Sequence, residues 1–128
     1  MPLRRSSRVT SSETSNWEAV PQEQISELIG RRMIYGQNVM LVRWEFSKGA
    51  HVAMHRHPHE QVSVVEKGKL RMSIGGEEVS LDPGNIRVIP PNTLHDAEAL
   101  VDCVVVDIFS PPREDFINGQ GQGYLNRD

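Results

Sequence analysis

From residue 38 onward the chain alternates between apolar and polar residues in short runs, which are separated by Gly, Pro and Asn. In NVMLVRWEF, residues 38–46, the even-numbered positions from Met40 to Phe46 are apolar, whereas Arg43 and Glu45 lie between them. Successive side chains of an extended chain point to opposite sides, so a period of two places the apolar set on one face. This run therefore predicts a half-buried strand.

The same alternation continues downstream. We expect strands in the runs that begin at residues 51, 61, 70, 77, 86 and 101, which read HVAMHRH, QVSVVE, LRMSI, EEVSL, IRVI and VDCVVVDIF. Gly75 and Gly76 predict a tight hairpin turn between two of them. Only PQEQISELIGRR, residues 21–32, is expected to form a short helix. Short strands with turn signals every 8 to 12 residues or so indicate an antiparallel barrel or sandwich of the jelly-roll type.

The length of 128 residues suits one domain. Residues 1–16 combine three arginines with many Ser and Thr and contain no apolar run, so we expect a solvated, disordered tail there. The domain is expected over residues 17–118, and a second tail over residues 119–128.

Charge, hydropathy and cysteine content indicate which partners and which location to expect. The formal net charge is −3 with no basic patch, which argues against a nucleic-acid partner. No apolar run approaches the roughly 20 residues that would span a bilayer, so no membrane association is expected. Cys103 is the only cysteine and lies in an apolar run, which favours a buried thiol and a reducing, cytoplasmic location.

Three of the five histidines fall in HRHPHEQ, residues 55–61. His55, His57 and Gln61 are all odd-numbered, so in an extended chain they can face the same side. Adjacent imidazoles that became charged would repel, and they are costly to bury unless a metal keeps them neutral. His95, which follows the two prolines of PPNTLH, is a candidate fourth ligand. A core or surface histidine without a metal is the alternative at each position taken alone.

These positions resemble the two sequence motifs of the cupin superfamily. The first motif is matched by Gly49, His55, His57, Gln61 in the usual place of glutamate, and Gly68. The second is matched by Gly84, Pro90 and His95, with Asn92 in place of a glycine and Ala99 in place of an asparagine. Asn92 is a mild departure, because Asn tolerates the left-handed backbone conformation that glycine would supply.

The resemblance implies an all-β, single-domain cupin, that is, a double-stranded β-helix or jelly-roll barrel. It also implies one divalent transition metal, Zn, Ni, Mn, Fe or Co, held by His55, His57, Gln61 and His95. Three imidazoles and an amide would leave the charge of the ion uncompensated, which makes it a stronger Lewis acid. This donor set favours acid–base chemistry on a carboxylated or hydroxylated small molecule, and it leaves oxygen activation open.

Asp107 and Arg113, in VVVDIFSPPRED, are the candidate catalytic residues. Asp107 shares its strand face with Phe109 and other apolar residues, and a position beside a metal would let it transfer protons. The alternative places Asp107 outside, at a sheet edge. Arg113 follows two prolines and is suited to bind a substrate carboxylate through two hydrogen bonds. Its alternative is a surface arginine paired with Glu114 or Asp115.

The segments HPHEQ, IPPNTLH, EAL and DIFSPPRED resemble the small cupins of the pectin-degradation type, often called KdgF. The resemblance implies conversion of 4,5-unsaturated uronates, the products of pectin and alginate lyases, to linear ketonised sugars. It assigns proton transfer to Asp107 and places Phe109 and Arg113 against the substrate. The alternatives are an Fe(II)-dependent dioxygenase and a non-catalytic module that binds a small acid.

The outer face of one predicted strand suggests self-association. Val62 and Val64 point away from the side of Gln61 and form an apolar strip on the outside of the barrel. We expect a homodimer that covers this strip.

Overall fold

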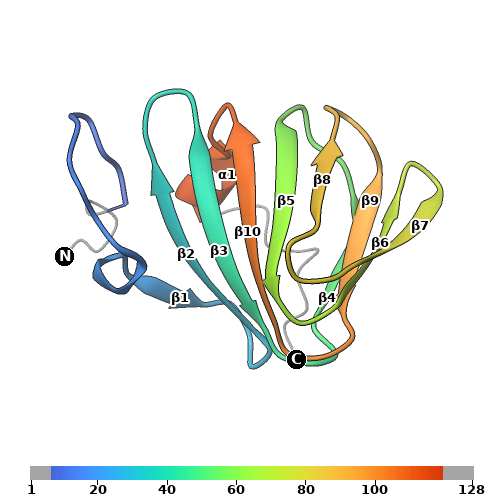
Figure 1. Cartoon of the computed structure of the whole chain (residues 1–128). Coiled ribbons are helices and arrows are strands. Elements are labelled where there is room, and N and C mark those ends of the chain that lie inside the picture. The colour runs from blue at the N-terminus through green and yellow to red at the C-terminus, as the bar shows by residue number, and fades with distance from the viewer. Residues whose placement is uncertain (1–6, 120–128) are drawn as a thin grey trace.

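The computed structural model describes residues 7–119, which form two antiparallel β-sheets that face each other (Figure 1). In spatial order, the larger sheet contains β1 (Gln22–Gln24), β2 (Ile29–Tyr35), β3 (Met40–Phe46), β10 (Cys103–Ser110), β5 (Glu60–Lys67) and β8 (Ile86–Ile89). The smaller sheet contains β4 (His51–His55), β9 (His95–Ala99), β6 (Leu70–Ile74) and β7 (Glu77–Leu81). The predicted all-β jelly-roll architecture is confirmed.

Two short helices accompany the sheets within residues 7–119. A 3₁₀ helix, Trp17–Ala19, precedes β1, and helix α1, Glu114–Ile117, follows β10. Among residues 7–119 no helix is long and apolar enough to cross a membrane.

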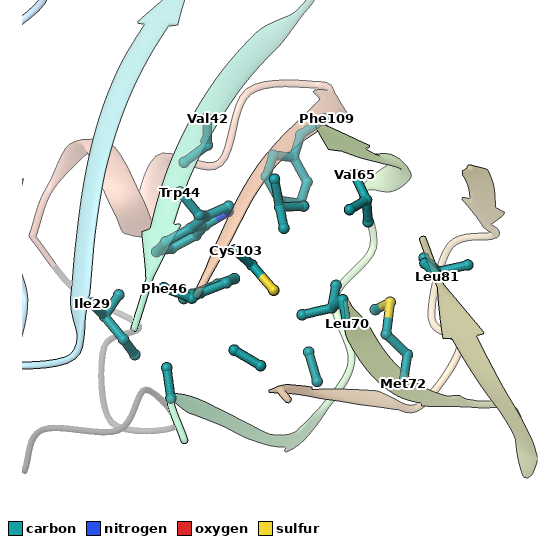
Figure 2. Packing of buried hydrophobic residues seen from close by; sticks show 14 of the residues in the cluster. Ile29, Val42, Trp44, Phe46, Val65, Leu70, Met72, Leu81, Cys103 and Phe109 are labelled. Carbon is teal, nitrogen blue, oxygen red and sulfur yellow. The ribbon is translucent and has the colours of Figure 1, made fainter. Parts of the chain in front are cut away.

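The core lies between the two sheets, where the period of two in the sequence places the apolar side chains. Figure 2 shows Trp44 and Phe46 from β3 on one side and Leu70 and Met72 from β6 on the other, all pointing into the same space. Burying each such side chain stabilises the fold by roughly 1.5–3 kcal/mol. Cys103 also lies in this core, as a free thiol, as predicted.

The helix predicted over residues 21–32 is wrong, because β1 and the start of β2 occupy this segment. The inward-facing set on β2 includes Ile29, Arg31 and Met33, so a charged residue interrupts the apolar alternation and conceals the strand. A helix this short is marginal in isolation, whereas the edge of β3 offers β2 a full ladder of backbone hydrogen bonds. Strand β9 was also not predicted; its inward positions hold a histidine and two alanines.

Two backbone positions in the motifs have unusual conformations. Asn92 has a φ of 61°, which confirms the left-handed conformation expected there, and its N–H donates to the carbonyl of His57 at 2.8 Å. The loop before His95 is thereby tied to the loop that carries His57. Gly68 has a φ of 93°, and a Cβ at this position would collide with the carbonyl of Asp102.

The predicted boundary of the N-terminal tail needs correction. Tyr35 of β2 donates its N–H to the carbonyl of Ser7, and Val9 donates to the carbonyl of Tyr35. Residues 7–9 therefore lie beside β2, because its backbone groups supply hydrogen-bond partners that composition does not reveal. Residues 1–6, and all of the predicted C-terminal tail beyond Gly119, lie outside the described residues.

Arg31 is a fully buried cation in this core. Its Nε donates to Glu23 at 3.1 Å, and its guanidinium lies over the ring of Phe116, 4.7 Å from the centroid. Neither Nη atom has a hydrogen-bond partner among the described residues. The charge of Glu23, whose side chain is 35% exposed, is the compensation that the structure provides. Loss of the exposed carboxylate leaves a buried charge without compensation, whereas loss of the buried guanidinium leaves a carboxylate that water can solvate, so the two losses affect stability differently.

We predict that Glu23→Gln lowers the free energy of unfolding by about 3 kcal/mol, because it leaves the buried Arg31 charge uncompensated. Arg31→Met leaves only a solvated carboxylate at Glu23, so it should cost far less or stabilise the protein. Urea unfolding of the two variants measures the difference. Equal losses in both would show that the pair does not have this asymmetry.

Candidate metal centre

Three imidazoles converge where the two sheets meet. His55 ends β4 and His95 begins β9, and the two are register partners in the smaller sheet. His57 lies in the loop that leads to β5. The candidate ligand atoms of the three residues all lie within 4.8 Å of one another. Residues far apart in sequence are thus close enough to share one ion.

Each of these imidazoles is oriented by a backbone carbonyl. A carbonyl can only accept, so the Nδ1 of each ring carries the proton and its Nε2 presents a lone pair, as is usual for histidine ligands of metals. The Nδ1-to-carbonyl distances are 2.8 Å from His55 to Ala53, 3.2 Å from His57 to His59 and 2.7 Å from His95 to Thr93.

Burial keeps these rings neutral. Together with the positive charges of neighbouring groups, including Arg113, it lowers the pKa of His55 to about 4 and the pKa of His57 to about 3. The pKa of His95 is lowered for the same reason, chiefly by burial. All three are therefore neutral near pH 7, which is the form that binds a metal.

Gln61, the second residue of β5, points into the same space and is 4% exposed. Its Nε2 lies 3.0 Å from the hydroxyl of Ser63, which in turn lies 2.6 Å from Oδ1 of Asp107. The hydroxyl donates to the carboxylate, so it accepts from the amide. This directs Oε1 of Gln61 toward His57, whose Nε2 is 3.1 Å away.

The facing atoms at this point are both acceptors. Nε2 of His57 presents a lone pair because its Nδ1 donates to a carbonyl, and Oε1 of Gln61 has no hydrogen to give. The buried Nε2 of His95 has no hydrogen-bond partner among the described residues. A cation between these atoms would satisfy all of them, so the donor set fits a divalent metal held by His55, His57, His95 and Gln61.

Asp107, on β10, lines the same cavity. Burial raises its pKa to about 6, against hydrogen bonds from Ser63 and from the indole of Trp44 that lower it. Trp44 Nε1 donates to Oδ2 at 2.9 Å. Asp107 thus faces the interior and not a sheet edge, one hydroxyl away from the Gln61 amide. Its catalytic role stays a prediction.

Arg113 combines the two alternatives that the sequence left open, an arginine at the cavity and an arginine paired with a neighbouring carboxylate. It is paired with Asp115, through Nε at 3.0 Å and Nη2 at 2.7 Å, yet it is 2% exposed and lines the cavity. Its guanidinium lies 4.0 Å from the ring centroid of Phe116 and 5.1 Å from that of Phe109. Its role in substrate binding stays a prediction, as does that of Phe109.

Two residues of this site were given no role in it from the sequence. Ser63 shares the parity of Gln61, which places it on the inward face of the strand, but parity does not reveal its hydrogen bonds to Gln61 and Asp107. Trp44 was assigned to the core, and only its hydrogen bond to Asp107 links it to the site. The cavity that these residues enclose has a volume of about 40 Å³, enough for a few water-sized groups.

Comparison with known proteins gives a match to the cupin domain over residues 42–109. A solved structure of an RmlC-like cupin from Shewanella frigidimarina NCIMB 400 is 34% identical, with a TM-score of 0.78 over 83% of this chain and 96% of that chain. The structure of KdgF from Halomonas sp. is 32% identical, with a TM-score of 0.73 over 77% of this chain and 94% of that one. A predicted oxalate decarboxylase from Thermotoga maritima shares the fold at 13% identity, with a TM-score of 0.70 over 78% of this chain and all, 100%, of that one. No curated protein gives a significant match.

The lowered pKa values predict a pH-dependent stability of the metal-free protein. Unfolded histidines titrate near 6.5, whereas folded His55 and His57 titrate at about 4 and about 3. Between these values only the unfolded state binds the protons, so the contribution of these two groups to the free energy of unfolding falls as the pH falls. Thermal unfolding in a chelator, from pH 7.5 to 4.5, measures the effect.

The matched control for this experiment is a histidine outside the cluster. His51→Asn changes an exposed histidine and should leave the pH dependence unchanged, whereas His55→Asn should reduce it. Bound metal should protect the wild type across the upper part of the range. Identical pH profiles for both variants would contradict the prediction.

Proposed function

Since the chain belongs to the cupin domain family, which matches residues 42–109, we propose that it is a metal-dependent enzyme that converts 4,5-unsaturated uronates to linear ketonised sugars. The observation that carries the proposal is the Gln61–Ser63–Asp107 hydrogen-bond chain, which puts a carboxylate beside an otherwise neutral set of donors. The similarity to KdgF from Halomonas sp. supports it.

In the proposed reaction the metal ion would supply Lewis acidity, and the protein orients the groups that hold the ion. A divalent ion, Zn, Ni, Mn, Fe or Co, held by the three imidazoles and Gln61, would supply Lewis acidity to a substrate oxygen. The protein orients the imidazoles through backbone carbonyls and the amide through Ser63, so these groups need little reorganisation on binding.

Asp107 is the group that moves a proton. Conversion to the linear ketone removes the proton of the anomeric hydroxyl as the bond from C1 to the ring oxygen breaks, and it then adds a proton to C4 of the enolate that is released. A single carboxylate can accept the first proton and deliver the second. A carboxyl with a pKa of about 6 holds either form near neutral pH, which suits this exchange. The indole of Trp44 fixes Oδ2, and the hydroxyl of Ser63 contacts Oδ1.

Arg113 makes the cavity attractive to an anion. Its positive charge lowers the pKa of His57 and of Asp107, so its field reaches both sides of the cavity. Asp115 holds the guanidinium in place, and the rings of Phe109 and Phe116 pack against it. We infer that a substrate carboxylate is bound on this side of the cavity.

We predict that the purified protein accelerates the loss of ultraviolet absorbance of a 4,5-unsaturated uronate, and that Asp107→Asn lowers the rate at least about 100-fold. Rates are compared per bound metal ion, because an amide at position 107 can also turn the Gln61 amide through Ser63 and weaken metal binding. Asp82→Asn, at an exposed turn, is the matched control and should behave as the wild type. No acceleration over the spontaneous rate by metal-loaded protein would refute the proposed reaction, and oxygen uptake with phenols or thiols would then favour the dioxygenase.

We also propose that the protein forms a homodimer through the outer face of β5 and β8. Val62 and Val64 are cross-strand partners of Val88 and Ile86, which are 54% and 64% exposed, so the four residues form one apolar patch. A patch of this kind on a sheet face favours association with a second copy.

The double variant Ile86→Lys with Val88→Lys should shift the sedimentation coefficient at micromolar concentration from that of a dimer to that of a monomer. Met54→Lys, on β4 and 50% exposed, is the control and should remain dimeric. A wild type that sediments as a monomer would show that the patch has another role.

A further inference from the structure

A second cleft, much larger than the metal cavity, includes His57 in its wall. Its volume is about 700 Å³, within the range of about 300–1,000 Å³ typical of small-molecule sites. Its lining comes from three segments, residues 35–37, residues 56–59, and residues 111, 112, 114 and 115, together with Arg8 and Ile117. Prolines 58, 111 and 112 stiffen two of these segments, so the cleft is largely preformed.

The ion pairing of the arginines distinguishes this cleft from the rest of the surface. The structure describes eight arginines, and six of them have a side-chain hydrogen bond or ion pair: Arg31, Arg32, Arg43, Arg71, Arg87 and Arg113. Within residues 7–119 the two without such a partner are Arg8 and Arg56, and both line this cleft. The chain carries more acidic than basic residues, so acceptors were available to pair with them.

Other groups in the cleft suit a polar ligand. Nδ1 of His59 is buried and has no hydrogen-bond partner among the described residues. Glu114 also lines the cleft and can accept from hydroxyl groups. A guanidinium presents a planar fork of N–H groups that matches the two oxygens of a carboxylate or a phosphate.

We propose that this cleft is an anion-binding site, distinct from the metal cavity, for a hydroxylated small molecule that carries a carboxylate or phosphate group. Arg8 and Arg56 bind the anionic group, while His59 and Glu114 contact the hydroxyls. The site does not depend on the proposed reaction. The carbonyl of His59 orients the imidazole of His57, so a ligand here lies against the loop that positions a metal ligand.

Calorimetric titration of the purified, metal-loaded full-length chain tests the proposal, with three probes: D-galacturonate, inorganic phosphate and neutral galactose. The double variant Arg8→Gln with Arg56→Gln removes both charges from the cleft and leaves the metal cavity intact, so any anion bound at the metal remains. The wild type should bind one more equivalent of galacturonate or of phosphate than the variant, or bind it at least tenfold more tightly. Which of the two probes shows this difference identifies the anionic group.

The control is the double variant Arg43→Gln with Arg87→Gln, which removes two arginines that are paired elsewhere on the surface. It should bind like the wild type. The proposal is overturned if neither anion binds differently to the wild type and the cleft variant, if the control loses binding equally, or if galactose binds as tightly as the anion that shows the difference. Because none of these readouts is activity, a failure of the uronate reaction would leave the result interpretable.

Discussion

The site depends on the orientation of one amide. The Ser63 hydroxyl donates to Asp107 at 2.6 Å, so its remaining capacity is to accept from Gln61, and the amide oxygen is left facing His57. If Ser63 were absent, the amide could rotate and present its NH₂ group to the imidazoles, which would repel a cation. The direction of a single hydroxyl proton, set by a buried carboxylate, therefore decides whether this pocket offers four lone pairs to a metal or three.

The hydrogen bonds that link Gln61, Ser63 and Asp107 also explain why glutamine stands where the family motif has glutamate. A glutamate at position 61 would place a second carboxylate one hydroxyl away from Asp107, and two buried carboxylates at that distance could not both ionise. With an amide at 61, the negative charge resides on Asp107 alone, outside the ligand set and free to exchange a proton. In the proposed function this leaves the carboxylate for acid–base chemistry instead of coordination, and the proposed ketonisation requires such a separation of roles.

Much of this could be predicted from the sequence, because spacing and parity carry through to a strand. Gln61 faces inward on β5 as its parity predicts, and the turn at Asn92 has the conformation that its motif position demands. His55 and His57 converge as the motif spacing predicts, although the register of β4 shifts between Val52 and His55 and His57 lies in a loop. Three features could not be predicted. Strand β2 was not predicted, because Arg31 interrupts its apolar alternation. The role of Ser63 depends on hydrogen-bond partners that the strand pattern does not show. The burial of Arg113 depends on Phe116, which comes from a helix too short to predict from the sequence. Each depends on contacts between distant segments.

The position of the centre between the sheets has a further consequence. His55 and His95 come from the smaller sheet, whereas Gln61, Ser63 and Asp107 come from β5 and β10 of the larger one. The ligand set exists only when the two sheets are packed against each other, so an ion that binds it stabilises the packed state over any opened one by mass action. Conversely, the core formed by residues such as Trp44 holds the sheets at the spacing that the ion needs, and Trp44 itself extends from that core to the catalytic candidate Asp107. The same side chains therefore pack the core and form the candidate site. For this reason the hydrogen-bonded series from His57 through Gln61, Ser63 and Asp107 to Trp44 is buried.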